Sequence, residues 1–158
     1  MTDKADDDLR EDIVNLHDAF LNANLQYELM LRQPMDQDPV TFMISNRGRL
    51  ERAWVSYLYV LVEAWRAPGN AAARHWIDSN VSTDRLGSLL RAAEDTGCLE
   101  TLRETRHYMS HRDKRPYWDS GRYAFFGRFE EVRDLHREFG SVLLTAIRKF
   151  GTGEESAV

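Results

Sequence analysis

Residues 9–30, which read LREDIVNLHDAFLNANLQYELM, carry the clearest structural pattern in the chain. Apolar side chains recur there at alternating steps of four and three residues, at Leu9, Ile13, Leu16, Phe20, Ala23, Tyr27 and Met30. That spacing is typical of one face of an α-helix and is held for about six turns. Because an apolar face must be covered by other elements, this stretch predicts one helix of a bundle.

Further helical patterns follow at about 44–67, 71–80, 83–96, 99–111 and 129–150. Prolines and glycines separate them, and Gly97 is expected to end one of these helices. Residues 55–65 are apolar almost all round, which predicts the most buried helix. No segment alternates with period two. We therefore expect an all-α bundle of four long helices plus short helices, with residues 1–150 as one domain and residues 151–158 as a flexible tail.

The composition is that of an ordinary globular chain. Of the 158 residues, 42% are hydrophobic and 30% are charged, which fits one folded domain. No apolar run approaches the roughly 20 residues of a membrane span, and the acidic start lacks the apolar core of a signal peptide. The single cysteine, Cys98, excludes an internal disulfide. We expect a cytoplasmic protein with no membrane contact.

The net charge of −5 is unevenly distributed. Residues 1–31 hold two basic and eight acidic side chains, whereas residues 101–128 hold seven basic and three acidic ones, together with His107 and His111. The chain as a whole therefore does not favour polyanions, but this one basic segment could. The alternative is that the segment forms a solvated face.

The basic segment contains a recognisable motif. Residues 102–113 read LRETRHYMSHRD, in which Arg106 is followed after four residues by His111. This resembles the signature of the HEPN superfamily (higher eukaryotes and prokaryotes nucleotide-binding domains), an Arg, a polar residue and then a His. His107 fills the polar position. HEPN domains are small helical bundles with the motif late in the chain, and residues 46–66 look like their buried second helix.

The resemblance implies a metal-independent endoribonuclease of the toxin or antiviral defence kind, or a descendant that kept the fold and lost the activity. It also implies RNA as the substrate and a homodimer as the assembly. Because such an activity harms its host, a neutralising antitoxin or another regulatory protein is an expected partner. No cofactor is expected.

The residue chemistry of the motif suits RNA cleavage without a metal. The reaction needs a proton taken from the 2′-OH and another given to the leaving 5′-oxygen, and histidine titrates near neutrality. Arginine stays charged and grips phosphate with a planar fork. His111 is thus the candidate acid or base, and Arg106 the candidate phosphate clamp. His107, four residues before His111 on the same helical face, completes the catalytic set.

Helix geometry constrains that assignment. Arg106 and His111 lie roughly 140° apart around an ideal helix, so they share one site only if the helix ends between them or if two copies face each other. Substrate-binding candidates are the nearby basic and aromatic residues, whose mixture suits single-stranded RNA: Arg103, Arg112, Lys114, Arg115 and Tyr117. Glu63, within the most apolar helix, is a supporting candidate that could pair with a motif residue or simply reach the surface.

Several alternatives remain. His107 and His111 have helical metal-ligand spacing, but the second Glu-x-x-His of a di-iron bundle is absent, so no metal site is expected. The chain could be a catalytically silent HEPN bundle that binds nucleotide, RNA or protein. It could also be an interaction bundle in which the stripe of residues 9–30 forms a dimer seam. His17, His75 and His136 are interpreted as ordinary helix residues.

Overall fold

A computed structural model describes residues 4–35, 41, 45–111 and 127–152, and for residues 110 and 111 it describes only the backbone. The elements are α1 (Lys4–Leu31), α3 (Asn46–Arg66), the 3-10 turn η1 (Pro68–Asn70), α4 (Ala71–Asn80), α5 (Asp84–Asp95), α6 (Cys98–His111) and α7 (Phe129–Thr152). The described ranges contain six α-helices and no strand, so the predicted all-α bundle is confirmed.

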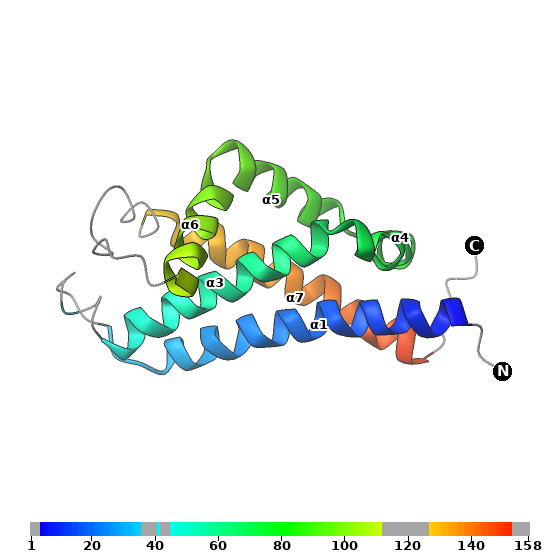
Figure 1. The fold of residues 1–158 in the computed structure, drawn as a ribbon, viewed down its shortest axis with the longest axis horizontal. Coiled ribbons are helices and arrows are strands. Elements are labelled where there is room, and N and C mark those ends of the chain that lie inside the picture. Colours follow the sequence, from blue (N-terminus) through cyan, green and yellow to red (C-terminus); the bar gives the residue numbers. More distant parts are fainter. Residues whose placement is uncertain (1–3, 36–40, 42–44, 112–126, 153–158) are drawn as a thin grey trace.

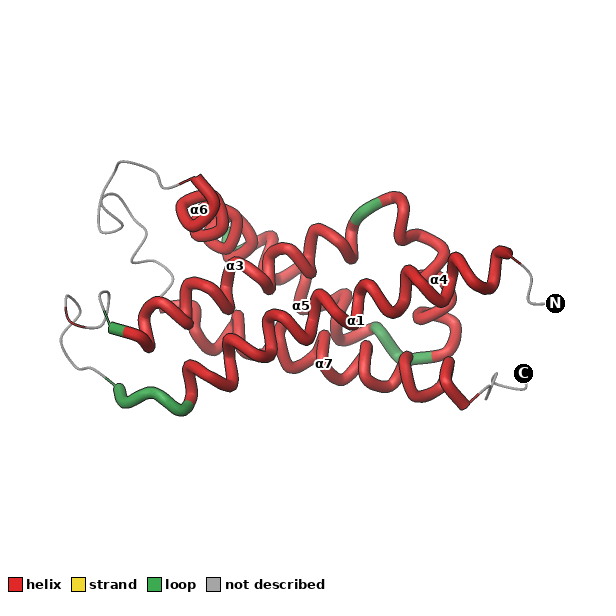
Figure 2. Tube along the Cα trace, turned by 60° about the horizontal axis from the view of Figure 1, so that its bottom comes forward, coloured by secondary structure: helices red, strands yellow, loops and turns green. Residues whose placement is uncertain are grey.

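Three helices form the body of the bundle. α1, α3 and α7, of 28, 21 and 24 residues, are the longest, and α1 packs along both of the others (Figure 1). α6 crosses α3 and is seen nearly end-on in Figure 2, while α5 packs on α6 and α7. α3 is therefore shared between the long helices and the motif helix, and it positions α6.

The apolar stripe predicted from residues 9–30 is the α1 part of the core. Six of its seven side chains are buried, and Leu9 is partly buried against them. The stripe meets Trp54, Leu58 and Leu61 of α3, which are fully buried. The stripe is buried within the core of a single chain, so the alternative that it forms a dimer seam is wrong. α3 is also not buried all round, because Tyr57 on its outer side is 42% exposed.

Side chains from neighbouring elements cap the helix C-termini. Arg47 donates to the carbonyl oxygens of Met30 (3.2 Å) and Gln33 (2.9 Å) at the end of α1, and Lys149 donates to Asn80 (2.7 Å) at the end of α4. The last carbonyls of a helix lack partners within it and carry partial negative charge, so cations are favoured there. The first contact ties α1 to α3, and the second ties the short helix α4 to α7.

Two residues mark the ends of α5, and α7 ends later than expected. Gly97 adopts the left-handed conformation with φ 74° and ends α5, as predicted. Thr83 occupies the N-cap position of α5, but its hydroxyl donates to Asp78 (2.6 Å) instead of capping the helix. α7 continues to Thr152, two residues into the segment predicted to be a tail, and residues 153–158 lie outside the described chain.

A polar network occupies the centre of the core. His136 is 2% exposed, and its Nδ1 accepts a hydrogen bond from the indole of Trp54 (3.1 Å). Its Nε2 therefore carries the proton and donates to Oδ1 of Asn24 (3.1 Å). Burial, aided by Arg137, lowers the pKa of His136 to about 4, so the ring is neutral. The interpretation of His136 as an ordinary helix residue was wrong.

Candidate functional site

The motif helix α6 is held on α3 by its own buried face. Leu99, Leu102 and Thr105 are buried, and the hydroxyl of Thr105 returns a hydrogen bond to the carbonyl of Thr101 (2.9 Å). Every third or fourth residue of α6 therefore faces α3. The remaining faces present the polar motif residues along the edge of the α3–α6 contact, where Arg106 is half-buried.

Arg106 is fixed by two residues of α3. Its guanidinium donates to a carboxylate oxygen of Glu63 and lies over the ring of Tyr59, 5.9 Å from the centroid. The side chains of Arg106 and Glu63 are 39% and 46% exposed, so their ion pair contributes little to stability by itself. The ion pair instead sets the orientation of the side chain, because the planar guanidinium of Arg106 lies between a carboxylate and an aromatic face.

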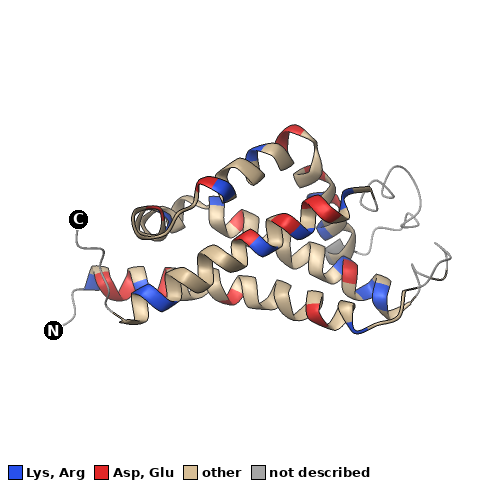
Figure 3. Ribbon diagram, turned by 180° about the vertical axis from the view of Figure 1, so that it is seen from behind, with Lys and Arg blue, Asp and Glu red and all other residues tan. Residues whose placement is uncertain are grey.

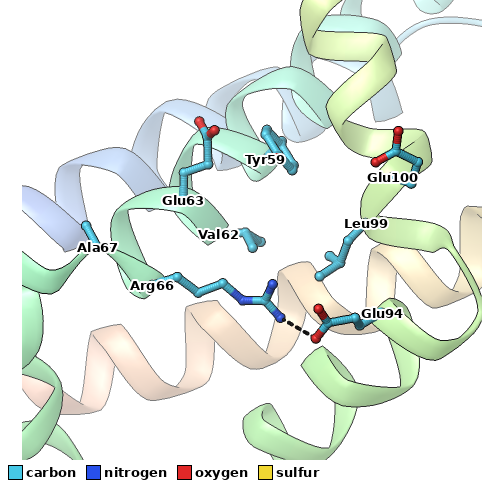
Figure 4. A pocket seen from close by; sticks show the side chains of 8 residues that line it. All are labelled: Tyr59, Val62, Glu63, Arg66, Ala67, Glu94, Leu99 and Glu100. Carbon is cyan, nitrogen blue, oxygen red and sulfur yellow. Dashed lines mark hydrogen bonds and ion pairs between the residues drawn. The ribbon is translucent and has the colours of Figure 1, made fainter.

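Beside this pair lies a groove of about 510 Å³ between α3 and the segment from α5 to α6 (Figure 4). Val62 and Leu99 supply its apolar surface, and Glu63 and Tyr59 lie on its α3 side. Arg66, also on α3, reaches across the groove and donates a hydrogen bond to the carboxylate of Glu94 on α5 (3.2 Å). The complete lining is Tyr59, Val62, Glu63, Arg66, Ala67, Glu94, Leu99 and Glu100. The groove is thus apolar in its middle and charged at its edges.

Each arginine around the groove already has a carboxylate partner. Arg106 pairs with Glu63, Arg66 with Glu94, and Arg103 with Glu100. The hydrogen bond from Arg103 lowers the pKa of Glu100, and the same contact raises the pKa of Arg103. In Figure 3, basic and acidic residues are likewise interspersed along the helices. An anion that binds here therefore competes with a glutamate for the arginine.

Tyr59 is the aromatic group of the site. Partial burial raises the pKa of its hydroxyl, and the negative charge of Glu63 raises that pKa further. The hydroxyl therefore stays protonated at neutral pH and can serve as a hydrogen-bond donor. Tyr59, Glu63 and Arg66 are spaced i, i+4 and i+7 on α3, and this helical signal could have identified the groove wall from sequence. Of the three, sequence reasoning singled out only Glu63.

The path of α6 bears on how Arg106 and His111 could act together. α6 remains helical from Cys98 through His111, so it does not end between the two motif positions. The five-residue step then leaves these positions roughly 140° apart around the helix. The first arrangement that the sequence leaves open, in which the helix ends between Arg106 and His111, is therefore not found.

The other sequence candidates fall into two groups. Arg103 and His107 lie on exposed parts of α6, where Arg103 engages Glu100. The remaining binding candidates, Arg112, Lys114, Arg115 and Tyr117, lie outside the described residues, as does the side chain of His111. The site that can be described therefore consists of Arg106 with its α3 partners and the adjoining groove.

Other reactive groups lie elsewhere or are inert. Among the residues that the structure describes, no three His, Cys, Asp or Glu side chains gather where they could hold a metal ion. Cys98 is fully buried, and burial raises the pKa of its thiol to about 12. A thiol that stays protonated is not a nucleophile, so Cys98 has no direct chemical role.

Comparison with known proteins gives no match: no family model, curated protein or solved structure corresponds to this chain. Within the described ranges, no helix has the length and apolar character needed to cross a membrane.

Proposed function

We propose that the chain is a metal-independent endoribonuclease of the HEPN type that acts as a homodimer. The observation that supports this most is Arg106, which Glu63 and Tyr59 orient at the edge of a groove. The same helix carries His107 and ends at His111. An oriented cation can stabilise the charge that develops on phosphorus, and histidine can transfer protons, so this helix carries both kinds of group used in RNA cleavage without a metal.

In the proposed reaction, Arg106 exchanges the carboxylate of Glu63 for a phosphate of the RNA. Both ligands present two oxygens to the same planar fork, so the exchange keeps the hydrogen-bond geometry. The 2′-oxygen attacks phosphorus as a base takes its proton, and the bond from phosphorus to the 5′-oxygen breaks as an acid supplies a proton. The products are a 2′,3′-cyclic phosphate and a free 5′-OH.

The homodimer supplies the second histidine that the reaction needs. One copy contributes His111 as the base, and the second copy contributes His111 as the acid, facing the first across a two-fold axis. The continuous helix between Arg106 and His111 supports this arrangement. An enzyme of this kind would act on RNA in the cytoplasm in antiviral defence or as a toxin, and a neutralising antitoxin or regulatory protein would restrain it.

The direct test is RNA cleavage in EDTA with four purified proteins: wild type, R106A, H111A and H75A. His75 lies exposed on α4, away from the site, so H75A is the matched histidine control. We expect cleavage by wild type and H75A, and a loss of at least about a hundredfold in R106A and H111A. Equal cleavage by all four proteins would reveal a contaminating nuclease and would contradict the proposal.

A second candidate function is a catalytically silent module that binds RNA, nucleotide or protein. The observation in its favour is that glutamates neutralise all three arginines around the groove. Fluorescence anisotropy with a labelled single-stranded RNA separates the two candidates. A silent RNA-binding module would bind this RNA without cutting it and would lose affinity in R106A, whereas H111A would bind as wild type does.

A further inference from the structure

The outer face of α1 carries a line of exposed apolar side chains. Val14, Leu21 and Leu25 are 40%, 44% and 54% exposed. At 100° per residue the three fall within about 40° of one another, on the side of α1 opposite the buried stripe. Exposed apolar side chains that share one helical face can form an interaction surface when a partner covers them together. We call Val14, Leu21 and Leu25 the α1 ridge.

Charged residues flank the α1 ridge symmetrically and with opposite signs. Arg10 lies nine residues before position 19 and Glu28 nine residues after it, and both are exposed on the ridge side of α1. Val14 and Leu25 lie five and six residues from the same position. Suppose that a second α1 runs antiparallel across this point. Arg10 of each copy then lies opposite Glu28 of the other, which makes two ion pairs, and Val14 of each copy lies opposite Leu25 of the other.

Arg10 and Glu28 cannot satisfy each other within one chain. They are 18 residues apart, which is about 27 Å along a helix. Neither forms an ion pair with any residue in the described ranges. A second copy offers each of them a partner of opposite charge at the required spacing.

The ends of the bundle show the same complementarity on a larger scale. The first turns of α1 are acidic, with Asp6, Asp8 and Glu11 exposed. At the opposite end, Arg32 follows α1 and Arg49 lies in the first turn of α3, and both are exposed. An antiparallel pair of α1 helices lays the acidic end of each copy toward the basic end of the other.

We propose that the α1 ridge is a self-association surface that holds a second copy of this chain antiparallel about a two-fold axis near residue 19. The surface is separate from the groove, because α3 lies between α1 and α6 (Figure 1). The proposal does not depend on the proposed ribonuclease activity. A molecule that used both this surface and the α6 contact would assemble beyond a dimer.

Charge reversal with rescue tests the pairing, with the association constant measured by sedimentation equilibrium. R10E replaces two attractive contacts in the dimer with two repulsive ones, and we expect it to weaken association by about tenfold. E28R should do the same, and R10E/E28R should restore wild-type association. R137E, a reversal of an exposed arginine on α7, is the matched control and should leave association unchanged.

Cross-linking tests the direction of the pairing. Cys98 is buried, so a cysteine introduced on the α1 ridge is the only exposed thiol in the described ranges. With a short bis-maleimide, a mixture of V14C and L25C should give a covalent dimer joining the two variants. A wild-type chain that stays monomeric at high concentration, a double reversal that fails to restore association, or V14C that links chiefly to itself would each overturn the proposal. A strictly monomeric chain would also contradict the homodimeric ribonuclease, whereas a failed rescue or self-linking of V14C overturns only the α1 ridge and leaves the cleavage assay unchanged.

Discussion

Glu51 gives the chain an unusual pH dependence of stability. This glutamate of α3 is 6% exposed, and burial raises its pKa to about 7, although Arg47 and Arg52 oppose the shift. The ordinary value is 4.5, so the unfolded chain ionises Glu51 more readily than the folded chain does. The contribution of Glu51 to stability is therefore greatest below pH 4.5 and is lost as the pH rises to about 7.

The magnitude follows from the shift in pKa. About 1.4 kcal/mol per unit over the interval from 4.5 to about 7 gives a loss of about 3 kcal/mol at neutral pH. The E51Q variant cannot ionise, so its stability relative to wild type should rise by about 1.4 kcal/mol for each pH unit across this range. A buried amide that lacks a partner would add a constant cost, but that cost does not vary with pH.

His136 makes the test sharper because its effect has the opposite sign. Its folded pKa of about 4 lies below its ordinary value of 6.5, so its contribution is present above pH 6.5 and is lost as the pH falls toward 4. Between pH 4.5 and 6.5, the free energy of unfolding falls with rising pH because of Glu51 and rises because of His136, so the two effects nearly cancel in wild type. In E51Q the His136 slope stands alone, so this variant should lose about 1.4 kcal/mol for each unit of acidification.

The assay is urea unfolding followed by circular dichroism at pH 4.5, 5.5, 6.5 and 7.5. E11Q removes an exposed carboxylate of α1 and should stay within about 0.5 kcal/mol of wild type throughout. A difference between E51Q and wild type that is the same at every pH would refute the reasoning. It would mean that Glu51 has the same pKa in the folded and unfolded chains.

Two further perturbations have expected outcomes. A Cβ added at Gly140 would lie 2.8 Å from the ring of the buried Phe20, so G140A should lower the free energy of unfolding by about 1–3 kcal/mol. G87A, within α5 and free of close contacts, is the control and should not destabilise the chain in the same thermal unfolding experiment. E63Q removes the charge that neutralises Arg106, so RNA should bind severalfold more tightly at low salt in an anisotropy titration, and unchanged or weaker binding would contradict this role of the ion pair.

The fold was predictable where one helix carries its own signal. The alternation of apolar residues in α1 and the left-handed Gly97 are local features, and both are found as expected. The sequence could predict the burial of His136 but not its hydrogen-bond partners. Its spacing from Val132 and Phe139 places it on the apolar face of α7, but Trp54 and Asn24, its partners, are 82 and 112 residues away in the chain. Pairings across such separations depend on how helices pack, which periodicity does not encode.

The candidate site shows the same division. Glu63 stood out as a carboxylate within an apolar helix, and its contact with Arg106 is one of the partnerships that the sequence suggested. The groove arises from the crossing of α3 and α6 and from the Arg66–Glu94 bridge, so only the assembled helices define it. Whether Arg106 and His111 cleave RNA stays a prediction.

The most direct measurement of that prediction is the mass of the fragments produced from a synthetic RNA in EDTA. Wild type should leave a 2′,3′-cyclic phosphate on one fragment and a 5′-OH on the other. A matched RNA with 2′-deoxyribose at the cleaved nucleotide should stay intact, because its attacking group is missing. Cleavage of the deoxy-substituted RNA at the same bond, fragments with 5′-phosphate ends, or intact RNA after incubation with the folded protein would contradict the account.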